Sequence, residues 1–208
     1  MRKKDKLAMI LMVIILIIVS LFGCVPSKRR TAELINSGTL DVKEAKVKYF
    51  ANLYSLPVAV VGYADYVFVG KVLDIEGTKY EDDFPYTSYT ITALENIKGE
   101  LKLNERMFLI KEGGIMKNRL FIQVLEGDVL PKTDRTYVFL VKVNEKNELY
   151  SGSVNSNLEI KNAEEYKSSQ VYLNVLEAKA NEEVVEKDET GKRYISKHDV
   201  NFKDSNAA

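Results

Sequence analysis

The strongest constraint on the fold is a series of short segments rich in β-branched and aromatic residues between positions 64 and 162. The segments are residues 66–75, 86–97, 106–111, 120–125, 137–143 and 148–153. No helical pattern interrupts them, and closely spaced strands without helices favour an antiparallel barrel or sandwich over a parallel α/β sheet. The sequence therefore predicts a mainly β domain over residues 64–162.

Three local signals refine this prediction. Gly70 lies inside the first segment, where a glycine marks a kink or a bulge. Residues 77–85 contain Gly77, three adjacent acids and Pro85, and this composition is typical of a loop. In the second segment Tyr89, Ile91 and Ala93 alternate with threonines, so we expect these three residues on one buried face.

The segments that flank the β domain carry weaker patterns. Residues 24–38 are polar and basic and predict a flexible tether. Residues 39–63 predict a helical lead-in with two short helices, the second beginning at Pro57. The apolar residues of the first helix recur at helical spacing and are Val42, Ala45, Tyr49 and Leu53.

The carboxy-terminal residues 163–208 predict a helical or charged tail that is partly disordered. Asn162 and Glu165 are spaced as in a capping box. Leu173, Leu176, Ala180 and Val184 repeat with helical spacing. Residues 171–175 are also compatible with a strand, and the sequence leaves this alternative open.

The amino-terminus has the three-part layout of a cleavable secretory signal over residues 1–23. Its basic head is followed by an apolar run, residues 7–19, and then by Ser20 and Gly23. A spanning helix needs about 20 apolar residues, and this run is shorter. Cleavage is therefore the prediction, and an uncleaved anchor is the alternative.

The last residues of the signal, Leu21, Phe22, Gly23 and Cys24, resemble the bacterial lipobox. This resemblance implies that Leu21, Phe22 and Gly23 are recognised by the signal peptidase and that Cys24 carries the lipid. Two acyl chains make such attachment persistent. We therefore expect a protein anchored by lipid to the cell membrane, on its extracytoplasmic face.

Charge and cysteine content narrow the possibilities further. The whole chain has 30 basic and 30 acidic residues, and removal of the signal leaves 26 basic against 29 acidic residues. This balance gives no general attraction to nucleic acid, so no nucleic-acid partner is expected. Cys24 is the single cysteine, so no internal disulfide can stabilise an exported domain.

The rhythm of the strands carries a resemblance over about residues 56–162. The segments 64–72, 89–99 and 137–140 look like those of uncharacterised Gram-positive surface lipoproteins. The resemblance implies a small antiparallel OB-like barrel of the netrin or tissue-metalloproteinase-inhibitor type, preceded by short helices. Such inhibitors use a disulfide-bonded terminal cysteine, which Cys24 cannot provide, so this mechanism of inhibition is not expected.

Candidate catalytic and metal-binding residues are few. The only histidine, His198, lies in the charged tail, and one His with one Cys cannot build a usual zinc site. Glu81, Asp82 and Asp83 are a weak candidate for Ca²⁺, although adjacent acids are more often a solvated loop tip. No cofactor is expected, because no phosphate-binding motif follows the glycines at 113 and 114.

These observations favour a binding or interaction module over an enzyme. The expected partners are the membrane, through the lipid, and an envelope protein, a peptide or a glycan. Two alternatives remain open: an inhibitor of an extracellular protease, and a hydrolase that uses carboxylates or a Ser/Lys pair such as one involving Lys111.

Overall fold

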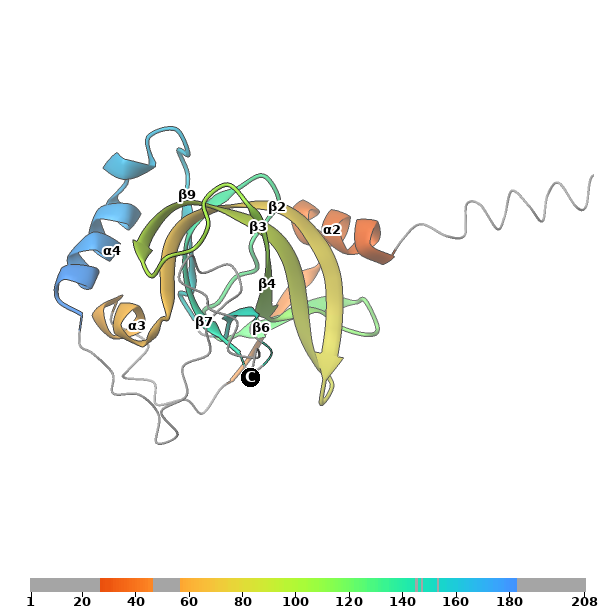
Figure 1. Cartoon of the computed structure of the whole chain (residues 1–208). Coiled ribbons are helices and arrows are strands. Elements are labelled where there is room, and N and C mark those ends of the chain that lie inside the picture. Colours follow the sequence, from red (N-terminus) through yellow and green to blue (C-terminus); the bar gives the residue numbers. More distant parts are fainter. Residues whose placement is uncertain (1–26, 47–56, 145, 147, 153, 183–208) are drawn as a thin grey trace, which may run out of the picture.

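The computed structural model describes residues 27–46, 57–144, 146, 148–152 and 154–182 and is mainly β (Figure 1). The elements are α2 (Ser27–Ser37), β1 (Asp41–Ala45), α3 (Pro57–Tyr63), β2 (Tyr66–Glu81), β3 (Phe84–Lys98), β4 (Arg106–Glu112), β5 (Gly114–Ile115), β6 (Phe121–Leu125), β7 (Thr136–Val143), β8 (Leu149–Ser151), β9 (Asn157–Ile160), the 3₁₀ helix η1 (Tyr166–Ser168) and α4 (Gln170–Ala180). The predicted mainly β class is thus confirmed. Among the described helices, none has the length and apolar character that a membrane span requires.

The strands form two sheets. The larger sheet has the order β2-β3-β4-β8-β7-β9, and the smaller one has the order β1-β6-β5. Strand β2 pairs with β7 as well as with β3, so the pairings from β2 through β3, β4, β8 and β7 return to β2. Most of the pairings are antiparallel, as the sequence predicts. Two of them, β4 with β8 and β1 with β6, are parallel.

The long hairpin of β2 and β3 forms the arch at the centre of Figure 1. The predicted bulge at Gly70 is confirmed by a register shift between Val69 and Gly70. The predicted loop over residues 77–85 is wrong, because both strands continue to a tight turn at Asp82 and Asp83. Both turn residues have positive φ, 47° and 65°, which matches the twist of a two-residue hairpin and is tolerated by aspartate.

The main core lies inside this arrangement. Tyr89, Ile91 and Ala93 are fully buried, as the alternation in their segment predicts. They pack with residues of β2, β4 and β7. Among these are Phe68 and Phe139, whose stacked rings have centroids 5.4 Å apart. A second core lies between β7, α3 and α4 on the opposite side of the strands from α2.

Residues 24–38 were expected to be a flexible tether, but Ser27–Ser37 form helix α2, which packs against β2. The side chain of Ile35 is buried, and Ala32 and Leu34 pack against the main core. The helix stops before Gly38, whose φ of 64° suits the left-handed residue after a helix. The sequence pattern missed the helix because its apolar face is short and tertiary packing stabilises it.

The prediction of a first helix in the lead-in is also wrong for its described residues, 39–46. Asp41–Ala45 form β1, which pairs in parallel with β6. Val42 is 59% exposed, so its helical spacing with Ala45 did not reflect a buried face. The second expected helix is confirmed as α3 (Pro57–Tyr63).

At the carboxy-terminal side, a helix rather than a strand forms over residues 170–180. Ser169 caps it by accepting a hydrogen bond from the Tyr172 amide at 3.2 Å, so the cap predicted at Asn162 was misplaced. The buried face comprises Tyr172, Val175 and Ala178, whereas the predicted Leu173 and Leu176 are exposed.

Candidate functional site

A groove of about 420 Å³ lies on the surface between α2, the end of the β2–β3 hairpin and β4. The residues that line it are Arg30, Thr31, Leu34, Glu76, Gly77, Thr78, Lys79, Tyr80, Ser88, Phe108, Leu109, Ile110, Ile115, Arg119 and Glu148. Phe108 is 58% exposed although its neighbours in β4, Met107 and Leu109, are buried. The groove therefore offers an aromatic surface to solvent.

Helix α2 is held against the hairpin by charge pairs. Lys28 Nζ lies 2.8 Å from Asp74 Oδ2 and 2.7 Å from Glu76 Oε2. Thr90 also donates a hydrogen bond to Glu76, at 2.6 Å. Hydrogen bonds from Lys28 and Thr90 lower the pKa of Glu76, which therefore stays ionised and is already partnered.

The charge that the groove presents to a ligand depends on which of its charged side chains already have partners. Glu76 pairs with Lys28, and the Glu148 carboxylate accepts a hydrogen bond from the side-chain Nδ2 of Asn144 at 3.0 Å. Arg30, Lys79 and Arg119 form no salt bridge within the described residues. Three basic side chains are thus available to a ligand, while the two acids are satisfied within the protein.

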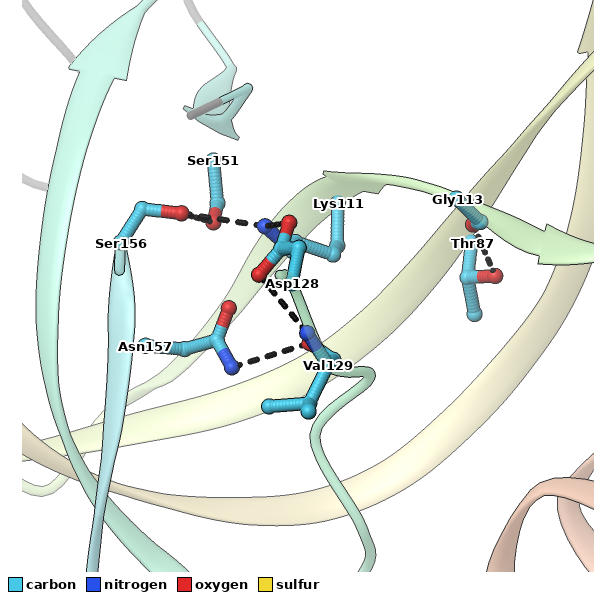
Figure 2. Close-up of polar contacts among 8 residues, drawn as sticks. All are labelled: Thr87, Lys111, Gly113, Asp128, Val129, Ser151, Ser156 and Asn157. Carbon is cyan, nitrogen blue, oxygen red and sulfur yellow. Dashed lines mark hydrogen bonds and ion pairs between the residues drawn. The ribbon is translucent and has the colours of Figure 1, made fainter. Parts of the chain in front are cut away.

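A second polar site is enclosed in the main core (Figure 2). Lys111 follows Met107 and Leu109 on the inward face of β4 and is fully buried. Its Nζ contacts Asp128 Oδ2 and donates to Ser156 Oγ at 3.1 Å. Ser156 in turn lies 2.6 Å from Ser151 Oγ. We call Lys111, Asp128, Ser151 and Ser156 the buried cluster.

Further hydrogen bonds hold the buried cluster in place. Asp128 Oδ1 accepts from the Val129 amide at 2.9 Å, and Asn157 Nδ2 donates to the Val129 carbonyl at 3.1 Å. Nearby in Figure 2, Thr87 donates to the Gly113 carbonyl at 2.7 Å. Gly114 begins strand β5, where an added Cβ would lie 2.5 Å from Thr87 Oγ1.

Burial is the largest influence on the pKa values of Lys111 and Asp128. It lowers the pKa of Lys111, although Asp128 and Glu112 oppose the shift. It raises the pKa of Asp128, against the opposing effect of Lys111. Because low polarity disfavours the charged form of each group, both shifts bring the neutral amine and the neutral acid closer in energy to the ion pair.

The predicted Ser/Lys pair is therefore present in space, as Lys111 with Ser156. Both side chains are fully buried, and the groove is not lined by either of them. A serine nucleophile acting on an external substrate must be reachable, so this geometry does not support hydrolysis of such a substrate.

The acidic candidate for Ca²⁺ lies at the tip of the hairpin. Asp83 Oδ1 lies 2.5 Å from Lys117 Nζ, and this contact lowers the pKa of Asp83. No group of three or more metal-binding side chains gathers anywhere in the part of the chain that the structure describes. Leu21, Phe22, Gly23, Cys24 and His198 lie outside the described residues.

Comparison with models of protein families gives no match, and comparison with curated proteins gives no significant similarity. The functional argument therefore depends on the geometry of this chain alone. The sequence did not single out the groove, because Arg30, Lys79, Phe108 and Arg119 belong to four separate segments.

Proposed function

We propose that this protein is a lipid-anchored binding module that holds an acidic peptide segment of an envelope protein in the groove between α2 and β4. The observation that carries the proposal is a set of three basic side chains, Arg30, Lys79 and Arg119, that form no salt bridge within the described residues and lie beside the exposed ring of Phe108. Basic clusters bind carboxylates through charge-assisted hydrogen bonds, and an aromatic ring adds apolar contact.

The position of the groove supports a binding role. We further propose that β2, β3, β4, β8 and β7 form an OB-like barrel, because their pairings run in a ring and β4 pairs in parallel with β8. OB-type domains bind ligands on the face of their second and third strands, between the first hairpin and the connection of the last two strands. Here those elements are β3, β4, the β2–β3 hairpin and the segment ending at Glu148, all of which contribute to the groove.

The lipid anchor remains an expectation from the lipobox-like residues before Cys24. It would keep the groove close to the membrane surface and to other envelope proteins. The inhibitor and hydrolase alternatives gain no specific support from the described geometry, because the predicted Ser/Lys pair, Ser156 with Lys111, is fully buried.

Binding can be tested with a fluorescent oligoglutamate peptide and the full chain in detergent. The triple variant Arg30→Ala/Lys79→Ala/Arg119→Ala is expected to weaken binding by about tenfold or more, equivalent to about 1.4 kcal/mol. The affinity of the unaltered chain should fall as salt is added. Fluorescence anisotropy measures both effects.

The matched control is Lys102→Ala/Lys132→Ala/Lys161→Ala, which removes the same charge from exposed positions outside the groove. It should bind like the unaltered chain. Equal loss in both variants would show unspecific charge attraction and contradict the proposal. A second probe, the anionic polysaccharide heparin, distinguishes the ligand class: tight heparin binding without peptide binding would replace the peptide by a glycan.

A further inference from the structure

The buried cluster places an amine and a carboxyl group in direct contact where water is excluded. The side chain of Lys111 is 0% exposed and that of Asp128 is 2% exposed. By contrast, the side chains of the ion pair of Lys117 and Asp83 are 59% and 84% exposed. The two pairs have the same chemistry and differ in their surroundings.

We propose that Lys111 and Asp128 join through an intramolecular amide bond that forms once the chain has folded. The geometry supplies the contact, because Nζ of Lys111 meets Oδ2 of Asp128, one bond away from the carboxyl carbon (Figure 2). The fold holds both groups in one orientation, which makes their encounter effectively unimolecular. This inference does not depend on the proposed ligand of the groove.

The reaction needs no external reagent. A proton passes from the Lys111 ammonium to the Asp128 carboxylate along their hydrogen bond, which gives a neutral amine and a neutral acid. The nitrogen lone pair then attacks the carboxyl carbon and forms the C–N bond. The C–O bond to the hydroxyl breaks, and this hydroxyl leaves as water with a proton taken from the nitrogen. No group is oxidised or reduced.

The surrounding residues favour each step. Burial lowers the pKa of Lys111 and raises the pKa of Asp128, and both shifts favour the neutral pair. Ser156 Oγ accepts from Lys111 Nζ at 3.1 Å and lies 2.6 Å from Ser151 Oγ, so Ser156 holds the Lys111 amine in place and is positioned to accept a proton from the nitrogen. The Val129 amide fixes the other carboxyl oxygen. The product amide removes two buried charges, which are costly in such surroundings.

Such a bond would have a clear structural consequence. It would tie β4 to the connection between β6 and β7, two parts of the main core that are separated along the chain. The chain has no disulfide to do this, because Cys24 is its single cysteine. A covalent link in the core would stabilise an exported domain in the same way as a disulfide, by restricting the unfolded chain.

Peptide mapping of the purified full-length chain tests the proposal directly. Trypsin cleaves after lysine and arginine but not after an amide-linked lysine. The cross-linked chain should yield residues 107–117 joined to residues 120–132, with the summed mass reduced by one water molecule. Detection of only the separate peptides 107–111, 112–117 and 120–132 would overturn the proposal.

Two controls separate burial-driven chemistry from mere proximity. In the same digest, no cross-link is expected between Lys117 and Asp83, because their exposed charges stay solvated; a cross-link there would point to an artefact of preparation and contradict the assignment. Lys111→Arg keeps the positive charge but should abolish the joined peptide. Its persistence in that variant would also overturn the proposal.

The role of Ser156 as a positioning residue has its own test. Ser156→Ala keeps both reacting groups and is expected to lower the fraction of joined peptide measured at a fixed time after purification. Ser168→Ala, on the surface of η1, is the matched control and should leave that fraction unchanged. An unchanged fraction in Ser156→Ala would contradict the proton route through this hydroxyl.

Discussion

Two buried tyrosines show how single polar atoms affect the stability of this core. The hydroxyl of Tyr89 is buried and has no hydrogen-bond partner within the described residues. Burial, followed by the nearby Tyr137 and Asp128, raises the pKa of Tyr89. The hydroxyl of Tyr137 instead accepts a hydrogen bond from the Lys132 amide at 2.9 Å. The same chemical group therefore has opposite energetic consequences at the two positions.

Tyr89→Phe is expected to leave the free energy of unfolding unchanged or to raise it, because removing an unsatisfied buried hydroxyl relieves its desolvation cost. Tyr137→Phe should lower the free energy of unfolding by about 1 kcal/mol, because a hydrogen bond is lost. Urea denaturation of both variants checks the pair. A loss in Tyr89→Phe as large as in Tyr137→Phe would mean that the Tyr89 hydroxyl has a partner.

Among the elements, the packing of α4 against β3 depends on one carboxylate. Glu95 accepts hydrogen bonds from Tyr166 at 2.5 Å and from Tyr172 at 2.6 Å, and it lies 3.1 Å from Lys167. Burial alone would raise the pKa of Glu95, but these three partners outweigh it and lower the pKa. Burial and the Glu95 carboxylate raise the pKa values of Tyr166 and Tyr172 to about 12.

These shifts give the contribution of Glu95 a defined pH window. Since the pKa of Glu95 is lowered in the folded state, its contribution is present above the ordinary value of 4.5 and is lost as the pH falls through the lowered pKa. Since the tyrosine pKa values are raised, their contribution is present below 10 and is lost as the pH rises through about 12.

Glu95→Gln should therefore destabilise the protein most near neutral pH, and the difference from the unaltered chain should shrink below pH 4.5. Thermal unfolding at several pH values measures this. In a titration of Glu95→Gln followed by tyrosinate absorbance, the pKa values of Tyr166 and Tyr172 should fall part of the way from about 12 towards 10. Glu177→Gln, on the exposed face of α4, is the control, and equal effects in both variants would contradict the assignment.

The elements also differ in how well the sequence predicts them. Strand β3 and helix α3 were predicted because their own residues carry the pattern: alternation around Tyr89 in one case, and a proline start at Pro57 in the other. Helix α2 and strand β1 were not predicted. Helix α2 is stabilised by its packing against β2, and strand β1 is stabilised by its pairing with β6. A partner that is distant in the sequence leaves no local pattern.

For the whole molecule, a lipid on Cys24, as proposed, would place the groove at the membrane surface. Cys24→Ala should abolish incorporation of labelled fatty acid and move the protein from the membrane fraction to the soluble fraction, because the acyl chains hold it there. Fractionation of cells with and without the substitution measures this. A Cys24→Ala protein that stays processed and membrane-bound, with no label taken up by the unaltered chain, would contradict the anchor.

The candidate sites were predictable only in part. Lys111 was singled out from the sequence as one member of a Ser/Lys pair, but its contact with Asp128 and its complete burial were not, because the aspartate lies on a connection between strands. The groove was missed entirely. Its basic residues come from α2, β2 and the segment after β5, and their side chains meet only when those elements pack.

The sequence by itself determined the mainly β class, the faces of its central strands and the expectation of an exported, lipid-bearing chain. These properties are local, since alternation, turn chemistry and a terminal signal each reside in a few consecutive residues. Only the tertiary structure decided the ring of strand pairings, the helix over residues 27–37, the groove and the enclosed contact of Lys111 with Asp128. Each of these depends on residues far apart in the chain, whose proximity follows from packing and not from any local pattern.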